Sequence, residues 1–218
     1  MKENPLHHRI SPTLSFELLL WKNGLQFIAG LDEAGRGAWA GPVTSAAVIL
    51  PPDEGIIKIL YGVRDSKQMT PRQRAEWAIK IKQHALAWGV GFATHKEIDE
   101  IGILPATRLS MERALTELAI WPHHLLLDAL KLPGIPLSQT PIIHGDCLCL
   151  SIAAASVLAK TERDLVMIDL DASFPGYGFA RHKGYGTAIH RAALEKQGVS
   201  KIHRRSYAPV KLKLDGLS

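Results

Sequence analysis

The stretch 27–50 most constrains what this chain can fold into. It begins with an apolar run typical of a buried strand, and two carboxylates, Asp32 and Glu33, follow at once. A glycine-rich turn, 35–37, comes next and leads into a second apolar run. Burying a strand that ends in two negative charges is costly unless a cation neutralises them. The turn adds free backbone N–H groups and the Arg36 side chain, which suit phosphate. The stretch therefore predicts a site for metal and phosphate.

Two other interpretations of this stretch have to be weighed. The turn also fits the dinucleotide-binding pattern G-x-G-x-x-A over residues 35–40. That pattern requires a helix to begin at the glycines, so that its N-terminus faces the pyrophosphate. Here Gly41 and Pro42 follow, and then a β-branched, alanine-rich run without an N-cap, so we reject dinucleotide binding. A strand whose acidic end simply reaches solvent is the plain alternative to a metal site.

Composition and charge narrow the class of protein. The chain has 218 residues, 46% hydrophobic and 22% charged, as in an ordinary globular domain with a substantial core. No apolar run approaches the roughly 20 residues of a membrane span, and the N-terminus lacks the apolar region of a signal peptide. We therefore expect a cytoplasmic protein that does not associate with a membrane. Cys147 and Cys149 are expected to be buried, reduced thiols. From Arg181 to Lys213 there are nine Lys and Arg and one acid, which favours a polyanion partner.

Strand-like and helix-like segments alternate, which predicts an α/β layered domain. We expect a loose tail and a short helix in 1–26, and one domain over 27–218 whose basic helical part begins near 174. The expected strands are 27–32, 43–50, 87–93, 125–127 and 142–144, and the expected helices are 12–23, 105–118, 151–169, 187–197 and two that begin at capping boxes at Thr70 and Thr94.

Acids follow three of these strands: Asp32 with Glu33, then Asp128, then Asp146. If the strands adjoin, four carboxylates converge and repel one another, which two divalent cations, Mg²⁺ or Mn²⁺, would resolve. Two such metals can activate a water on one side of a phosphodiester and stabilise the leaving oxygen on the other. Because strand side chains alternate, Glu33 reaches the same metals only if the chain turns there. Asp164 is a rival ligand, but it lies four residues after Lys160, as in an ordinary helical ion pair.

Several blocks, in order over about residues 27–210, resemble the ribonuclease HII family. They are 32–37 with 40–43, 65–67, Asp128, 145–146 with 151–164, 182–187, and 203–210. The resemblance implies the ribonuclease H-like fold, a mixed five-stranded sheet with helices on both faces and a helical C-terminal part. It also implies two divalent cations, Mn²⁺ or Mg²⁺, held by Asp32, Glu33, Asp128 and Asp146.

The resemblance further implies how substrate is recognised. The backbone of Gly35, Arg36 and Gly37 would contact the 2′-OH of the ribonucleotide, which distinguishes RNA from DNA. Tyr185 would pack against the next sugar and tolerate only deoxyribose there. Together they would direct cleavage to the 5′ side of even a single embedded ribonucleotide. The expected phosphate contacts are Lys67, Lys183 and Arg204.

Two positions depart from the family pattern. Ala38 stands where proline is usual, which loosens the turn because the fixed φ of proline is lost. Ala129 stands where glycine is usual, and it should be tolerated unless φ is positive there. Neither departure removes a reactive group.

We therefore expect a monomeric endoribonuclease without an obligate protein partner, acting on RNA–DNA hybrids and on DNA duplexes that contain ribonucleotides. It would leave 5′-phosphate and 3′-hydroxyl ends. No histidine is needed as the primary base, although His182 or His190 could assist proton transfer. The alternatives are a non-catalytic nucleic-acid-binding module and a strand-transfer or junction-resolving nuclease on the same fold. The sister family, ribonuclease HIII, carries an extra N-terminal domain, for which the residues before the first strand leave no room.

Overall fold

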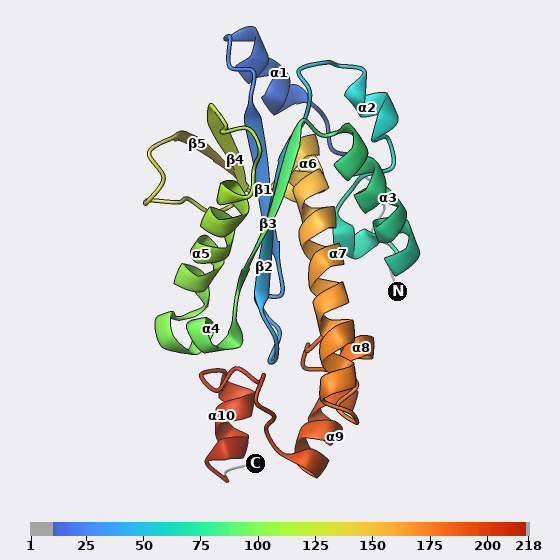
Figure 1. Ribbon diagram of the computed structural model, residues 1–218, viewed down its shortest axis with the longest axis vertical. Coiled ribbons are helices and arrows are strands. Elements are labelled where there is room, and N and C mark those ends of the chain that lie inside the picture. Colours follow the sequence, from blue (N-terminus) through green and yellow to red (C-terminus); the bar gives the residue numbers. More distant parts are fainter. Residues whose placement is uncertain (1–10, 217–218) are drawn as a thin grey trace, which may run out of the picture. The chain divides into compact units, whose positions relative to one another are not determined.

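The computed structural model describes residues 11–216 (Figure 1), so most of the expected tail at 1–12 lies outside the described residues. None of the helices in 11–216 combines the length and apolar character that crossing a membrane requires. In chain order the elements are α1 (Ser15–Lys22), β1 (Ile28–Ala34), β2 (Val43–Ile49), α2 (Ile56–Ile59), the 3₁₀ turn η1 (Ser66–Gln68), α3 (Pro71–His84), β3 (Ala87–Ala93), α4 (His95–Ile101), α5 (Ile103–Thr116), β4 (His124–Asp128), β5 (Ser138–Ile142), α6 (Gly145–Leu148), α7 (Leu150–Ser173), α8 (Phe179–His182), α9 (Ala188–Gln197) and α10 (Ala208–Leu214).

The strands form one five-stranded sheet in the order β3-β2-β1-β4-β5. β1 and β2 are neighbours, as the two apolar runs on either side of the glycine turn predicted. β4 pairs in parallel with β1 and with β5, and the register aligns Leu31 with Leu127. The expected mixed sheet with flanking helices is therefore confirmed. Because parallel strands end at the same edge, the residues after Leu31 and Leu127 emerge side by side.

The described residues fall into two compact units. The first contains the described part of Met1–Asp32, with Ala47–Trp88 and Ala119–Val157. Its core joins Ile28, Leu126, Ile142, Cys149 and Ile152, and partly buried side chains of α1 pack against it. A Cβ at Gly30 would lie 2.3 Å from the carbonyl carbon of Ser151, so the start of α7 lies directly on β1. Small residues at this end of the helix permit that approach, as the alanine-rich sequence suggested.

The second unit contains Glu33–Ala46, Gly89–Leu118 and Leu158–Ser218, as far as the last segment is described. One of its clusters joins Val43, Ala93, Ile98 and Ala106, where β2 and β3 meet α4 and α5. Another joins Ala40, Met167, Tyr177, Phe179, Ala193 and Ile202, which packs the end of α7 against the C-terminal segment. The basic C-terminal part therefore shares a hydrophobic cluster with Ala40 and the end of α7.

Local signals placed most helices correctly. Both expected capping boxes form, at Thr70 with Gln73 and at Thr94 with Glu97, and α9 has the Thr187 N-cap. The expected strand at 142–144 was wrong, because β5 comes earlier, at Ser138–Ile142, and includes Pro141. β5 is an edge strand, where a proline without an N–H is tolerated.

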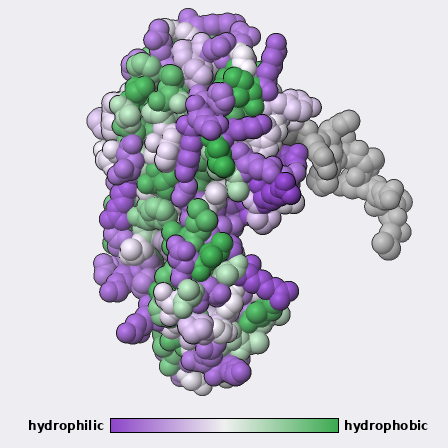
Figure 2. All heavy atoms as spheres, turned by 45° about the vertical axis from the view of Figure 1, so that its right-hand side comes forward, coloured by the Kyte–Doolittle hydropathy of each residue, from purple (hydrophilic) through white to green (hydrophobic). Residues whose placement is uncertain are grey.

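Cys147 belongs to the short helix α6, and Cys149 is the C-cap of that helix. Both are free thiols; Cys149 is buried, whereas Cys147 is only partly buried. On the face shown in Figure 2, hydrophobic residues lie in separate patches among hydrophilic ones, which is usual for a protein surface.

Candidate active site

Two of the predicted carboxylates lie where parallel strands reach the same sheet edge. The pairing of Leu31 with Leu127 places Asp32 on β1 beside Asp128 on β4. Asp32 is 4% exposed, and Asp128 is half-buried. Two carboxylates brought so close in a partly buried position repel each other and favour a cation between them.

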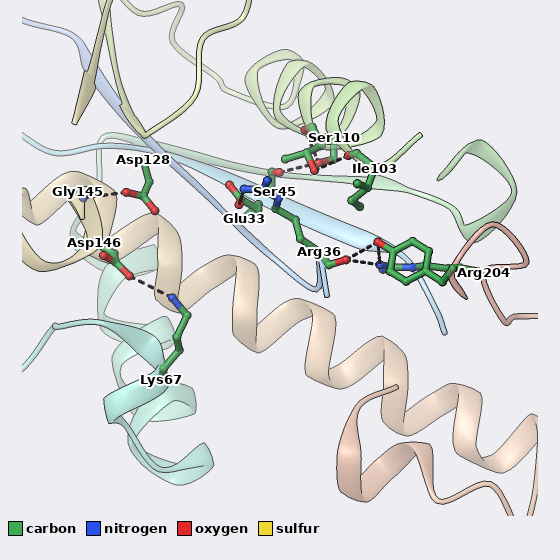
Figure 3. A network of polar contacts seen from close by, with 12 residues as sticks. Glu33, Arg36, Ser45, Lys67, Ile103, Ser110, Asp128, Gly145, Asp146 and Arg204 are labelled. Carbon is green, nitrogen blue, oxygen red and sulfur yellow. Dashed lines mark hydrogen bonds and ion pairs between the residues drawn. The ribbon is translucent and has the colours of Figure 1, made fainter. Parts of the chain in front are cut away.

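Asp146 joins Asp128 through the short helix α6. The backbone N–H of Gly145 donates to Oδ1 of Asp128 at 2.8 Å (Figure 3). A Cβ at Gly145 would lie 2.7 Å from Cδ1 of Ile152, so a larger residue would require the Ile152 side chain to shift. Asp146 itself is 5% exposed. The local backbone therefore positions Asp128 and buries Asp146 next to it.

Lys67 supplies the positive charge of this cluster. Its Nζ lies 3.4 Å from Oδ2 of Asp146 (Figure 3). It also lies 4.0 Å from Oδ1 of Asp65. Burial acts to lower the pKa of Lys67, but the charges of Asp146, Asp65 and Asp32 outweigh it and raise the pKa. The Lys67 side chain is nevertheless 77% exposed. It can therefore reach solvent or substrate as well as the carboxylates.

The cluster also shifts the acidity of Asp128. Burial raises the pKa of Asp128, the hydrogen bond from Gly145 opposes that shift, and the charge of Asp146 adds to it. A carboxylate cluster with one exposed ammonium as its cation fits hard divalent ions such as Mg²⁺ or Mn²⁺. Asp32, Asp128 and Asp146 are the predicted residues of the first unit that could hold such ions.

The condition for Glu33 to reach the metals, a turn of the chain at its position, is not met. β1 continues to Ala34, and the turn follows at Gly35, where φ is 95°. Oε1 of Glu33 accepts from Nη1 of Arg36 at 3.1 Å (Figure 3). Arg36, which the sequence suggested as a phosphate ligand, is therefore an ion-pair partner of Glu33, with its side chain 45% exposed.

The glycine turn rests on a buried arginine. A Cβ at Gly35 would lie 1.9 Å from Nε of Arg163, whereas a Cβ at Gly37 would meet nothing within 4 Å. Gly35 is thus required by close packing and by its positive φ. Gly37 instead leaves the outer side of the turn open. An open glycine next to an exposed backbone is suited to close approach by a ligand.

Arg163 connects this turn to the loop that contains Lys183 and Tyr185, the tyrosine predicted to contact the sugar. It is fully buried and donates through its three nitrogens to the carbonyl oxygens of Pro42, Lys183 and Ala40. Its guanidinium carbon lies 5.3 Å from the ring centre of Tyr185. Burial lowers the pKa of Arg163 to about 10, which still leaves it charged at neutral pH. The sequence reasoning included this residue in a family block but gave it no role.

Two expected phosphate contacts have other partners. Arg204 is fully buried, and its Nε and Nη1 donate to the carbonyl oxygens of Gly41 and Arg36 at 3.0 and 2.8 Å. A guanidinium with no exposed surface does not reach a phosphate, so the expectation for Arg204 is corrected: it supports the glycine turn from beneath. Lys183 has φ 54° and donates through Nζ to the carbonyl oxygen of Ala180.

Two further aspartates remain to be placed: Asp164, the rival metal ligand, and Asp65, to which the sequence assigned no role. Asp164 Oδ1 accepts from Nζ of Lys160 at 2.7 Å, which is the expected i,i+4 pair. Asp65 was not a predicted site residue. Among the described residues, ligand atoms of Asp65, Asp146 and Cys147 all lie within 4.8 Å of one another. Asp65 could have been found from the sequence, because it begins the Asp-Ser-Lys segment that also contains Lys67.

Comparison with known proteins agrees with this geometry. The family model of ribonuclease HII matches residues 29–210. Ribonuclease HII of Dehalococcoides mccartyi is 50% identical over 211 residues, covering 94% of this chain and 97% of that protein. Ribonuclease HII of Moorella thermoacetica is 51% identical over 199 residues, covering 91% and 95%.

A solved structure gives the same result at the level of the fold. The ribonuclease H2 of Pyrococcus horikoshii OT3 is similar with a TM-score of 0.73 and 26% identity, over 88% of this chain and 98% of that one. The chain therefore belongs to the ribonuclease HII family and is a metal-dependent endoribonuclease of the ribonuclease H type, which acts on RNA–DNA hybrids.

Proposed function

We propose that this enzyme also incises duplex DNA on the 5′ side of single embedded ribonucleotides, and that Asp32, Asp128 and Asp146 hold two divalent cations for the reaction. Glu33 joins them in this proposal through a local rearrangement of β1, which continues past Glu33 to Ala34. The observation that carries the proposal is the approach of Asp128 to Asp146 at the sheet edge where Asp32 also emerges. Either Mg²⁺ or Mn²⁺ suits such oxygen ligands. When bound, the two cations would activate the attacking water and stabilise the leaving 3′-oxygen, leaving 5′-phosphate and 3′-hydroxyl ends.

The residues around the cluster have distinct roles in this proposal. The Gly145 N–H fixes the orientation of Asp128 by occupying Oδ1. Lys67, which pairs with Asp146 but is mostly exposed, binds a phosphate of the nucleic acid when the carboxylates are engaged by cations. Arg36 neutralises Glu33 until substrate and cations arrive. Lys183 is a further phosphate contact, which requires its Nζ to leave the carbonyl oxygen of Ala180.

Sugar recognition follows from the second unit. The open side of the turn at Gly37 gives the backbone of Gly35, Arg36 and Gly37 access to a 2′-OH. Tyr185, held from beneath by Arg163, packs against the following deoxyribose and excludes a second hydroxyl. Arg204 acts indirectly, because it holds the carbonyl of Arg36 and so the shape of the turn.

Several broader features belong to the same proposal. Residues 27–218 act as the catalytic domain, and α1 covers the core of the first unit. The enzyme works in the cytoplasm as a monomer on RNA–DNA hybrids and ribonucleotide-containing DNA. The family contains an RNase HII from Archaeoglobus fulgidus that was solved in complex with PCNA, but no protein partner is proposed for this chain.

The first test is cleavage of a DNA duplex that contains one ribonucleotide, in Mg²⁺ and in Mn²⁺, by the wild type and by Asp128→Asn. Loss of a metal ligand should lower turnover by about 10³-fold or more, because transition-state charge stabilisation is lost. Binding of the duplex should persist. The product should be a nick 5′ to the ribonucleotide.

Matched controls separate the site from general effects of charge. Asp169→Asn removes an exposed carboxylate of α7 and should leave turnover unchanged. Asparagine at 128 can still accept from Gly145 through its amide oxygen, so the free energy of unfolding without metal should not fall. Wild-type turnover retained in Asp128→Asn would refute the ligand assignment. A wild type that cleaves hybrids but not the single ribonucleotide would refute the incision proposal.

A further inference from the structure

Three histidines of the C-terminal segment are buried together in the second unit. His182, His190 and His203 are 6%, 0% and 1% exposed. The rings of His182 and His190 stack with centres 4.4 Å apart, and the centres of His190 and His203 are 5.1 Å apart. The sequence reasoning considered His182 or His190 as aids to proton transfer. Their burial leaves neither ring free for that task.

The partners of His203 determine its protonation. The backbone N–H of Ser200 donates to Nδ1 of His203 at 3.0 Å, so Nδ1 carries no proton. In a neutral ring the proton is then on Nε2. Nε2 of His203 lies 3.0 Å from Nε2 of His190, to which it donates.

The partners of His190 lead to the complementary assignment. Nδ1 of His190 lies 3.0 Å from the carbonyl oxygen of Tyr185, which can only accept, so Nδ1 carries the proton. Nε2 of His190 is then free to accept from His203. The two assignments agree, and they form one directed chain of hydrogen bonds from Ser200 through His203 and His190 to Tyr185.

His182 fixes the other side of the same loop. The N–H of Gly184 donates to Nδ1 of His182 at 3.2 Å, and Nε2 of His182 donates to the carbonyl oxygen of Tyr177 at 2.8 Å. Gly184 has no room for a side chain, because a Cβ would lie 2.5 Å from the carbonyl oxygen of Ala40. The backbone on either side of the Gly184–Tyr185 peptide is therefore held by an imidazole.

We propose that His190, oriented by His203, is a positioning residue for sugar selection: its Nδ1–H holds the carbonyl of Tyr185 and thereby the place of the tyrosine ring against the deoxyribose. This inference rests on the proposed role of Tyr185. His190 does not contact the substrate, but it determines how selectively Tyr185 accepts deoxyribose.

The surroundings keep the chain of histidines neutral. Phe179 packs edge-on against His190, and Trp39 lies with its ring centre 5.4 Å from that of His190. Burial, with the neighbouring histidines, lowers the pKa of both His190 and His203 to about 4. The titratable groups that face the pair are His182, Tyr177 and His95. At neutral pH the donor directions are thus fixed.

Two substitutions of His190 separate the hydrogen bond from packing. In asparagine the amide nitrogen takes the place of Nδ1, whereas in glutamine it takes the place of Nε2. Glutamine fills more of the ring volume, so a packing role predicts that His190→Gln is the milder change. A positioning role through Nδ1 predicts the reverse.

The measurement is the ratio of kcat/KM for a duplex with one ribonucleotide to kcat/KM for a continuous RNA–DNA hybrid. His190→Gln should lower this ratio by about tenfold or more, because a small displacement of a positioned group costs rate steeply. His190→Asn should keep a ratio close to that of the wild type. Cleavage of the continuous hybrid should persist in both variants, which shows that they fold.

A second readout does not depend on substrate. Nitrogen-15 NMR of the wild type near pH 7 should show His190 with its proton on Nδ1, and His203 with its proton on Nε2. A proton on Nε2 of His190 would overturn the inference, as would equal ratios for the Gln and Asn variants. If the wild type itself does not distinguish the two substrates, the proposed function fails and the inference falls with it.

Discussion

The carboxylate cluster around Asp128 and the loop around Tyr185 both bury polar groups, but they satisfy them in different ways. At the cluster, the negative charge of Asp146 acts on Asp128, and the cation observed beside Asp146 is the mostly exposed Lys67. At the loop, the donors of Arg163 and the nitrogens of His190 are each matched to a backbone carbonyl or a neighbouring ring. In the proposed function the first arrangement takes up added cations, whereas the polar groups of Arg163 and His190 in the second already have partners within the protein.

This difference has a physical consequence. Removing a charge from the cluster relieves repulsion, so it should damage catalysis and spare the fold. Removing a donor from the loop leaves buried carbonyls unpaired, so it should damage the fold as well as sugar selection. Stability and activity can therefore be used to distinguish the two regions.

The largest effect on stability is expected for Arg163→Met. Three carbonyl oxygens, those of Ala40, Pro42 and Lys183, lose the donor that the fully buried Arg163 provides. Because each buried acceptor left unpaired costs about 1–3 kcal/mol, the loss of three bonds should lower the free energy of unfolding by about 3–5 kcal/mol. The change is measured by denaturant unfolding of the two proteins, as a shift in the midpoint at an unchanged m-value.

Arg72→Met is the control for this variant. Arg72 pairs with Glu76 on the surface of α3, with its side chain 90% exposed, so its loss should have little effect on unfolding. If both variants lower the free energy of unfolding equally, Arg163 does not stabilise the loop. The proposed difference between the loop and the carboxylate cluster is then wrong.

An acid titration should give the next largest effect. The folded pKa of His190 and of His203 is about 4, below the ordinary value of 6.5, so the unfolded chain binds more protons between these two pH values. The stability that comes from the neutral rings is therefore present above pH 6.5 and is lost as the pH falls toward 4. For one ring the full loss is roughly 3 kcal/mol.

The comparison variant for the titration is His203→Gln. Its amide can still donate to Nε2 of His190, but it does not titrate, so its free energy of unfolding should fall less steeply between pH 6.5 and 4 than that of the wild type. Parallel curves for the two proteins would assign the acid sensitivity to other groups.

Sequence reasoning succeeded where the signal is local. The capping boxes at Thr70 and Thr94 satisfy helix N-termini with residues three apart, and the apolar runs that became β1 and β2 need no distant partner to be recognised. Asp32 and Asp128, which the sequence marked as charges directly after buried strands, emerge at the same sheet edge, and their role as metal ligands stays a prediction.

The loop network could not be read in the same way. Arg163 and Arg204 look like any basic residues in the sequence, and only the fold buries them beneath residues more than a hundred positions away, such as Pro42 and Gly41. The direction of the His203–His190 hydrogen bond depends on the carbonyl of Tyr185 and the N–H of Ser200. These backbone partners are fixed by tertiary structure, so no spacing rule reveals them.

The smallest effect is expected on the cluster side, at Ala129, directly after Asp128. Ala129 has φ 54°, which the family glycine would adopt without strain, and its exposed methyl group offers no compensating burial. Ala129→Gly should therefore raise the free energy of unfolding by about 1 kcal/mol, even after the added flexibility of the unfolded chain is counted. Ala192→Gly, in the exposed face of α9, should instead lower it by about 1 kcal/mol. Opposite signs for the same chemical change would locate the strain at position 129. If both variants instead lower the free energy of unfolding equally, the backbone beside Asp128 is not strained. Charge repulsion is then the only destabilising feature of the cluster.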